Sequence, residues 1–325
     1  LVNIVKPGVG LELPLQQTPD IHETGAGAVW EIILRMIPEN PFQAMVEADM
    51  LAVIFFSILF GVFVTRLPEK GRNFFTELFD NLFQVMMMMT HFVILFAPIG
   101  IFGLIAGIVA TTGFSAFGSL IQFFFVVLAA LLIHAFITLP ILLRLIGRIK
   151  RPYRHLYNMT EALLTGFSTA SSNATLPLTM KNVEENSGVS NKITSFVLPL
   201  GATINMDGTA LYECVVAIFI AQVYGIELTF VQQWVIVFTA LLTSIGVAGV
   251  PMASLVAIAI ILRTIGLPLE GIGLIMVTDR ILDMCRTAVN VFSDSCGAVI
   301  IARLEGEQDL LADGHSDGLS GVEDL

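Results

Sequence analysis

The 325-residue chain is poor in charge, since Asp, Glu, Lys and Arg make up only 13% of it, against roughly 25% in a soluble domain. Hydrophobic residues reach 55%, which excludes both an ordinary water-soluble enzyme and a disordered chain. Basic residues are few, 16 against 27 acids, and a net charge of −11 excludes nucleic acid as a partner because its phosphates would be repelled. Cysteine is scarce too, and Cys214, Cys285 and Cys296 lack metal-ligand spacing, so we interpret them as reduced and structural.

Two long stretches contain no charged residue at all. The first covers residues 81–143, which is 63 residues, whereas a helix needs only about 20 apolar residues to cross a bilayer. The second covers residues 228–262 and includes Gly246, Gly249 and Pro251. The sequence therefore predicts an all-α polytopic protein that crosses the plasma (inner) membrane several times and is surrounded by membrane lipid.

The basic residues indicate how the predicted helices are oriented. Three bases lie between the first two helices, at about 43–65 and 73–111, and five lie at the end of the third, at about 114–146. These bases are Arg66, Lys70, Arg72, Arg144, Arg148, Lys150, Arg151 and Arg154. By the positive-inside rule both clusters are cytoplasmic. The C-terminus is predicted to be cytoplasmic as well, as an acidic tail in which the last 21 residues hold seven acids and no Lys or Arg.

Two further segments are too polar or too interrupted for simple spans. Residues 161–180 are rich in Ser, Thr and Ala, and residues 228–268 carry the small-residue sequence SIGVAGVPMAS between two apolar arms. Non-helical backbone at membrane depth persists only where it lines a cavity or is buried in protein, and paired interrupted segments indicate the binding site of a transporter. The sequence thus predicts two helical hairpins, with close packing through small residues as the alternative.

A third segment, residues 193–224, is a span broken by Asn205, Met206, Asp207, Gly208 and Thr209. An Asp and an Asn at mid-span are costly in lipid and indicate function. Carbonyl groups freed by the break, together with the carboxylate, make an oxygen site for a hard cation. A polar clamp between helices is the alternative.

The last predicted span, 278–303, carries polar residues on one face within an arc of about 100° at 3.6 residues per turn. These residues are Asp279, Asp283, Arg286, Thr287, Asn290 and Asp294. A guanidinium suits a carboxylate and an aspartate suits an ammonium group, so the stripe fits an amino acid with a second acid. Backbone amides at the two hairpin tips, at Ser171 and Ser172 and at residues 250–254, could hold the main-chain carboxylate. A salt bridge between Asp283 and Arg286 would explain only two of the six residues.

The segments SSNATLP, NMDGT, SIGVAGVP and DMCRTAVNVFSD resemble the glutamate/aspartate branch of the dicarboxylate/amino acid:cation symporter family. The resemblance covers the chain to about residue 305. It implies an inverted-repeat elevator transporter with two re-entrant helical hairpins and broken helices, which works as a homotrimer, is not an enzyme and has no cofactor. Sodium ions would be carried together with glutamate or aspartate. The resemblance also allows proton co-transport and the return of the empty carrier with K⁺.

The resemblance also implies a division of the chain into segments. Residues 1–7 would be the end of the third transmembrane helix, the helices upstream being absent, 8–40 an extracellular loop and 41–112 scaffold and trimerisation helices. Residues 113–304 would be the transport domain, with helix six, an inner hairpin 153–186, helix seven 190–224, an outer hairpin 228–268 and helix eight 271–303. Residues 305–325 would be the acidic tail.

Site residues follow from the same resemblance together with the tip amides. The expected substrate contacts are Ser171, Ser172, Thr209, Val250, Ser254, Asp283, Arg286, Thr287 and Asn290. The expected sodium ligands are Gly201, Asn205, Asn290 and Asp294 at one site and Asp207 at a deeper one. A third site would use backbone carbonyls near Thr203, Ser244, Ile245 and Val247. Glu213 matches the acidic amino-acid carriers and is the candidate proton carrier, because burial disfavours a charged carboxyl group.

Other functions remain as alternatives at this point. Within the family, the chain could be a proton-coupled C4-dicarboxylate carrier or a neutral amino-acid carrier, although Asp283 and Arg286 together favour an acidic amino acid. A channel would need a continuous pore lined by charges or carbonyls. An intramembrane hydrolase using Asp207 and Asp283 lacks any accompanying nucleophile and base.

Overall fold

The computed structural model describes residues 1–11, 37–46, 50–96, 99–100, 102–103, 106, 115–246, 254–308 and 310–311. Every element within these ranges is a helix. The chain divides into two compact units, one of Leu1–Ile21 with Phe117–Leu325 and the other of His22–Ala116. Most of the predicted loop 8–40 and of the predicted tail 305–325 lies outside the described residues.

The unit His22–Ala116 contains helices α3 (Pro41–Val46), α4 (Met50–Val64) and α5 (Glu69–Ile94). Helices α4 and α5 pack through phenylalanine rings, with Phe60 edge-on to Phe75 and Phe79 at centroid distances of 5.6 and 5.7 Å. Helix α5 begins at Glu69, earlier than the predicted residue 73. Pro68 directly precedes it, and proline favours the start of a helix because its fixed φ suits the first turn and its missing N–H is not needed there.

The larger unit contains the helices that are long and apolar enough to cross a membrane. Among the described residues there are three such segments, Gly118–Leu145, Asn191–Val223 and Leu269–Leu304. The first comprises α7 (Ser115–Ile133), a π-helical turn η1 (His134–Thr138) and α8 (Leu139–Leu145), and the second comprises α12 (Asn191–Ile204) and α13 (Asp207–Val223). The third consists mainly of α16 (Ile272–Leu304), preceded by the 3₁₀ turn η2 (Leu269–Gly271).

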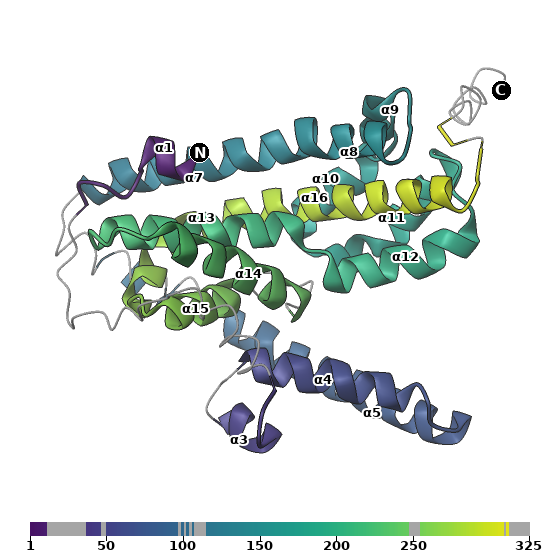
Figure 1. Cartoon of the computed structure of the whole chain (residues 1–325), viewed down its shortest axis with the longest axis horizontal. Coiled ribbons are helices and arrows are strands. Elements are labelled where there is room, and N and C mark those ends of the chain that lie inside the picture. The colour runs from purple at the N-terminus through teal and green to yellow at the C-terminus, as the bar shows by residue number, and fades with distance from the viewer. Residues whose placement is uncertain are drawn as a thin grey trace. The chain divides into compact units, whose positions relative to one another are not determined.

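Helix α16 is the central element of this unit. It runs between α8 on one side and α12 and α13 on the other (Figure 1). It also contacts α10 (Thr160–Thr169), α11 (Ser172–Glu185) and α15 (Ser254–Ile265). The remaining helices of the unit are α1 (Val2–Val5), α9 (Pro152–Asn158) and α14 (Phe230–Gly246). Because so many elements cover α16, its polar face is enclosed by protein.

Helices α10 and α11 pack against each other and are joined by a tight turn. Ala170 adopts the left-handed conformation at φ 51°, which costs about 1–2 kcal/mol for a residue other than glycine. Ser171 then caps α11, its side chain accepting a hydrogen bond from the backbone N–H of Ala174 at 3.3 Å. At the other end of α11, Asn186 and the last residue of α9, Asn158, each donate from the side chain to the other's backbone carbonyl. The tight turn thus joins α11 to α10 at one end, and the asparagine pair joins it to the end of α9 at the other.

An aromatic stack links α7 to α13 in the core. The rings of Phe123 and Phe219 are stacked at 4.5 Å, and Tyr212 lies 6.3 Å from Phe123. All three side chains are fully buried. This contact holds the first long span against α13, the helix that begins directly after the polar break at residues 205–206.

Replacing Phe123 with Ala should lower the free energy of unfolding by about 3–5 kcal/mol, because the substitution removes the ring stacked on Phe219 and leaves a cavity in its place. The matched control is Phe125→Ala on the same helix, where the ring is 59% exposed. Thermal unfolding of both variants in detergent measures the difference, and equal losses for the two would contradict the assigned core.

Candidate substrate and cation site

The polar stripe of α16 is buried along its whole length. The structure buries Asp279, Asp283, Arg286, Thr287, Asn290 and Asp294. Ser172, Thr209, Ser244 and Ser254, predicted from other elements, are buried as well. Two predicted residues, Val247 and Val250, lie outside the described residues, and for Ile245 only its place in α14 is described.

Arg286 is the hub of the substrate side of this stripe. Its Nη1 donates to the Ser254 hydroxyl at 2.7 Å, and its Nη2 donates to Asp279 at 2.9 Å and to Asp283 at 3.0 Å. The guanidinium also lies 3.9 Å from the centroid of the Tyr212 ring. The side chain is 1% exposed, so α13, α15 and α16 together replace the water that a guanidinium would otherwise bind.

Asp279 was on the predicted stripe but not among the predicted binding residues. Its carboxylate is fully buried and pairs with Arg286, seven residues further along α16. Seven residues are almost two helical turns, so the spacing could have indicated this pair. Arg286 therefore has two carboxylate partners on its own helix, one of them the predicted amino-group ligand Asp283.

Asn290 joins the stripe to the break in the second span. Its Oδ1 accepts from the backbone N–H of Gly208 at 2.8 Å, and its Nδ2 donates to the Thr209 hydroxyl at 3.1 Å. A Cβ on Gly208 would lie 2.9 Å from the Asn290 Oδ1 and 3.1 Å from the Arg286 carbonyl oxygen. Glycine at this position therefore permits the close approach of α13 to α16.

The joined ends of α10 and α11 lie beside the same region. A Cβ on Gly166 of α10 would lie 3.7 Å from both Thr287 and Thr175 side chains. Ser172 is buried at the start of α11, next to the cap residue Ser171. The structure thus places α10 against Thr287, and both predicted tip serines lie at the helix end that carries the positive pole of the α11 dipole.

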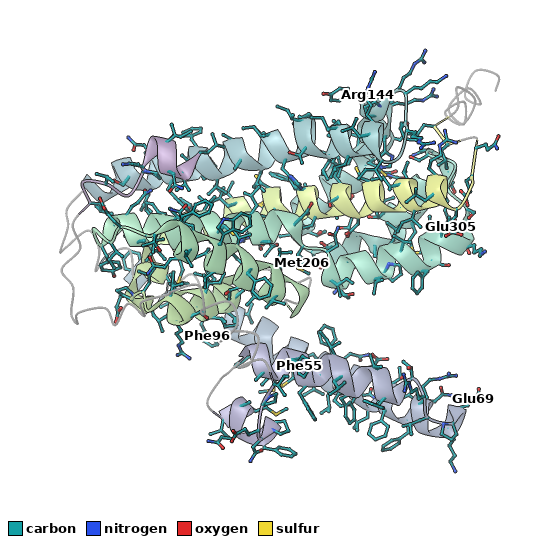
Figure 2. All side chains as sticks on the ribbon, in the orientation of Figure 1. Phe55, Glu69, Phe96, Arg144, Met206 and Glu305 are labelled. Carbon is teal, nitrogen blue, oxygen red and sulfur yellow. The ribbon has the colours of Figure 1, made fainter. Side chains whose placement is uncertain are left out.

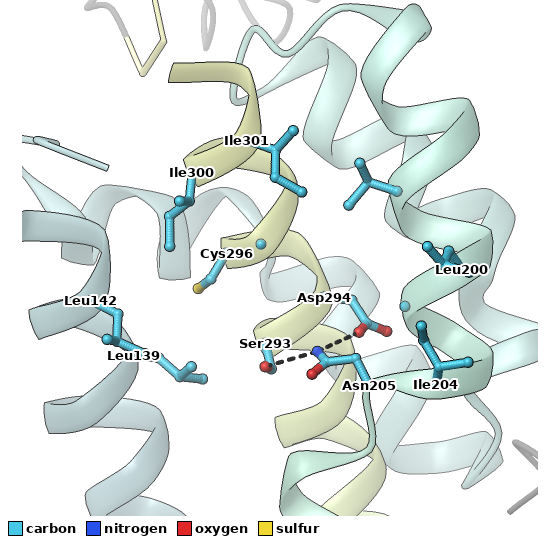
Figure 3. Close-up of a pocket in the computed structure, with 13 residues that line it drawn as sticks. Leu139, Leu142, Leu200, Ile204, Asn205, Ser293, Asp294, Cys296, Ile300 and Ile301 are labelled. Atoms are coloured by element: carbon cyan, nitrogen blue, oxygen red, sulfur yellow. Dashed lines mark hydrogen bonds between the residues drawn. The ribbon is translucent and has the colours of Figure 1, made fainter. Parts of the chain in front are cut away.

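Asp294 and Asn205, two of the predicted cation ligands, are hydrogen-bonded to each other. Asn205 Nδ2 donates to Asp294 Oδ1 at 2.9 Å and to the Ser293 hydroxyl at 3.2 Å. These three residues border a pocket of about 300 Å³, whose other walls are mainly Leu and Ile side chains (Figure 3). Gly201 lies against the carboxylate, since a Cβ there would be 2.6 Å from Asp294 Oδ1. The predicted ligands Gly201, Asn205 and Asp294 are therefore together.

Asp207 has a partner that the sequence did not indicate. Its Oδ1 accepts from the Gly208 N–H at 2.9 Å, and its Oδ2 lies 2.6 Å from His134 Nε2. His134 is the first residue of the π-helical turn η1, and such turns are frequent at functional sites. A histidine inside the 63-residue charge-free stretch was the available signal.

Thr203 is the predicted cation residue that the structure leaves exposed. Its hydroxyl donates within its own helix, to the carbonyls of Pro199 and Leu200. Ser244 likewise donates to the Leu241 carbonyl in α14. Helices α12 and α14 are in contact, and the backbone carbonyls near Thr203 and Ser244 stay the predicted ligands of the third cation site.

Glu213, the candidate proton carrier, is fully buried one helical turn beyond Thr209. Its Oε2 accepts from the Thr243 hydroxyl at 3.1 Å, whereas its Oε1 has no hydrogen-bond partner among the described residues. The adjacent Tyr212 ring supports the Arg286 guanidinium.

Comparison with known proteins gives a family match over most of the chain. The model of the sodium:dicarboxylate symporter family matches residues 1–304. The chain is 37% identical to the proton/glutamate-aspartate symporter of Escherichia coli over 318 residues, which cover 95% of this chain and 72% of that protein. It is 36% identical to the proton/sodium-glutamate symport protein of Geobacillus stearothermophilus over 312 residues, 94% of this chain and 73% of that protein.

An animal relative is similar over a shorter part of its length. The human excitatory amino acid transporter 1 is 46% identical over 256 residues, which cover 78% of this chain and 47% of that protein. The chain thus spans about half of the animal relative and nearly three quarters of the two bacterial ones.

Gly201→Ala should weaken sodium binding roughly 10- to 100-fold, the range seen when the groups that orient a metal ligand are disturbed, because the new Cβ would displace the Asp294 carboxylate. The control is Gly297→Ala, since Gly297 borders the same pocket but a Cβ there would meet no atom within 4 Å. An equilibrium sodium titration of both variants is the measurement. Wild-type sodium affinity in Gly201→Ala would remove Gly201 and Asp294 from the cation site.

Proposed function

The chain belongs to the sodium:dicarboxylate symporter family of membrane transporters, and we propose from this membership and from the site that it is a secondary active transporter of glutamate and aspartate, driven by sodium. The relatives named above are symporters or transporters of acidic amino acids, and the family is not one of enzymes. The single observation that carries the proposal is the buried Arg286 with its two aspartate partners.

The Arg286–Asp283 pair provides the chemistry for recognising the substrate. Without substrate the two charges neutralise each other at 3.0 Å, which is what a buried pair requires. An acidic amino acid brings a side-chain carboxylate for Arg286 and an ammonium group for Asp283, so each charge exchanges one opposite partner for another. The α11 end at Ser171 and Ser172 would take the main-chain carboxylate. A neutral amino acid would leave the guanidinium with less compensation.

Sodium coupling follows from the way one helix carries both sites. Asp294 lies about two turns after Arg286 on α16. Asn290, between them, forms hydrogen bonds with the Gly208 backbone N–H and the Thr209 hydroxyl at the start of α13. A cation held by Asp294, Asn205 and the freed carbonyls near Gly201 would hold the break in one geometry. Because coupling between two sites is reciprocal, a cation that orders this break would raise substrate affinity, and substrate would raise cation affinity.

The carrier mechanism that we propose is an elevator, in which residues 113–304 form a transport domain with two re-entrant hairpins that moves against a scaffold formed by residues 41–112 within a homotrimer. The division of the chain near residues 116–117 supports this assignment. The packing of α10 on α11 and of α14 on α15 supports the two hairpins. The basic residues after α8 support a cytoplasmic position for that end and for the C-terminus. Glu213 would carry a proton with the substrate, and K⁺ could return on the empty carrier.

Arg286→Cys should abolish uptake of aspartate and glutamate and permit small neutral amino acids. Removing one partner of a buried charge pair costs about 2–5 kcal/mol, and the cysteine leaves room in place of the guanidinium. Uptake of labelled aspartate and serine into proteoliposomes under a sodium gradient is the measurement. The control is Arg280→Cys, because Arg280 lies on the same helix but is exposed. Unchanged aspartate affinity in Arg286→Cys would contradict the substrate assignment, whereas aspartate current without saturation would indicate a channel.

Glu213→Gln should make uptake largely independent of pH, whereas an inward proton gradient should accelerate wild-type uptake at a clamped sodium gradient. The amide keeps the shape and can still accept from Thr243, but it cannot release a proton. Glu270→Gln, at an exposed glutamate, serves as the control and should keep the wild-type response. If Glu213→Gln keeps that response too, another group carries the proton.

A further inference from the structure

A basic pocket lies at the end of the first long span, away from the polar stripe. Its volume is about 510 Å³, and it is lined by Pro140, Ile141, Arg144, Lys150, Arg151, Pro152, Tyr153 and Arg154. Four of these eight residues are basic and none is acidic. Figure 2 shows Arg144 at the end of α8 next to α9, with basic side chains extending from this end of the unit.

The fold of the connection from α8 to α9 builds this pocket. The backbone N–H of Ile149 bonds to the Leu143 carbonyl at 3.0 Å, and Arg148 between them adopts the left-handed conformation at φ 51°. Gly147 is needed here because a Cβ would lie 2.8 Å from the Leu143 carbonyl oxygen. The chain therefore turns back sharply, and α9 packs on α8 and is fixed to the turn η1 by a hydrogen bond from the Tyr153 hydroxyl to the Phe136 carbonyl at 3.0 Å. The positive charges are thus gathered by a defined turn.

The surface next to the bases is apolar and exposed. Ile141 is 48% exposed, Leu145 71% and Ile146 48%, and the Tyr153 ring beside them is 58% exposed. Exposed aliphatic side chains on a membrane span face acyl chains, and tyrosine is enriched at the headgroup level. A ligand that fills this place must therefore offer an anion to Arg144 and Lys150 and hydrocarbon to α8.

We propose that this pocket binds the headgroup of an anionic phospholipid, with the phosphate against the basic side chains and the acyl chains along Ile141 and Leu145. Basic pockets at the cytoplasmic ends of membrane helices are suited to such headgroups. A soluble anion would use the charges but not the apolar flank. The chain's own acidic C-terminal segment, seven acids among residues 305–325, is another possible occupant, but it too would leave the flank uncovered.

The test is a titration of the full chain in neutral detergent with dioctanoyl phosphatidylglycerol, in which native mass spectrometry measures the bound lipid. Dioctanoyl phosphatidylcholine and inorganic phosphate are the comparison ligands. The variant Arg144→Gln with Lys150→Gln should bind phosphatidylglycerol with an affinity that is lower by roughly tenfold or more, because each base near an anionic lipid contributes to binding. The matched control is Lys70→Gln with Arg72→Gln, which removes the same charge from the other basic loop, where both side chains are also exposed, and should keep wild-type affinity.

Three results would overturn the proposal. Equal weakening in the two double variants would mean that net charge and not the pocket attracts the lipid. Equal affinity for phosphate, or for phosphatidylcholine, would remove the need for an anionic lipid. Lipid binding that emerges only after Asp313→Asn and Asp317→Asn would assign the pocket to the acidic segment. None of these readouts depends on transport, so the outcome is separate from that of the proposed function.

Discussion

The burial of one guanidinium inside a largely apolar protein is the constraint on which the rest of the site depends. A charge removed from water persists only when it is paired and hydrogen-bonded. Arg286 obtains two carboxylates from its own helix, a hydroxyl from α15 and an aromatic face from α13. These contacts join α13, α15 and α16 at the Arg286 side chain, the group that we propose binds the side-chain carboxylate of the substrate.

The same helix extends this network toward the cation side. Asn290 bonds to both Gly208 and Thr209 at the start of α13, and Asp294 lies against Gly201 and Asn205 at the end of α12. Both glycines permit polar side chains to approach a backbone that is not helical at residues 205–206. The break and the polar stripe therefore share hydrogen bonds of about 3 Å, which provide the direct link that the proposed coupling between substrate and cation requires.

Charged side chains are compensated differently in the polar stripe of α16 and at the end of α8. Within the polar stripe, Arg286 is paired with Asp279 and Asp283 on its own helix, whereas Asp294 accepts a hydrogen bond from the neutral Asn205 side chain. At the end of α8 the bases lie together at an exposed turn, where water and lipid headgroups can compensate them. The first arrangement compensates charge by fixed side-chain contacts, whereas the second leaves Arg144, Lys150 and Arg151 exposed.

The sequence by itself determined the helical class, the existence of a break in the second span and the polar face of α16, because hydrophobicity and helical spacing are local properties of a chain. It also indicated that Arg286, Asn290 and Asp294 would share that face. The break was predicted at residues 205–209, and the structure narrows it to residues 205–206 because Asp207, Gly208 and Thr209 form the first turn of α13. Only the tertiary structure decided which residues pair between helices: Ser254 with Arg286, His134 with Asp207, and Thr243 with Glu213. It likewise left Thr203 exposed. The physical reason is that a pairing depends on the distance between helices far apart in sequence, and that distance is set by packing around α16 and not by any local pattern.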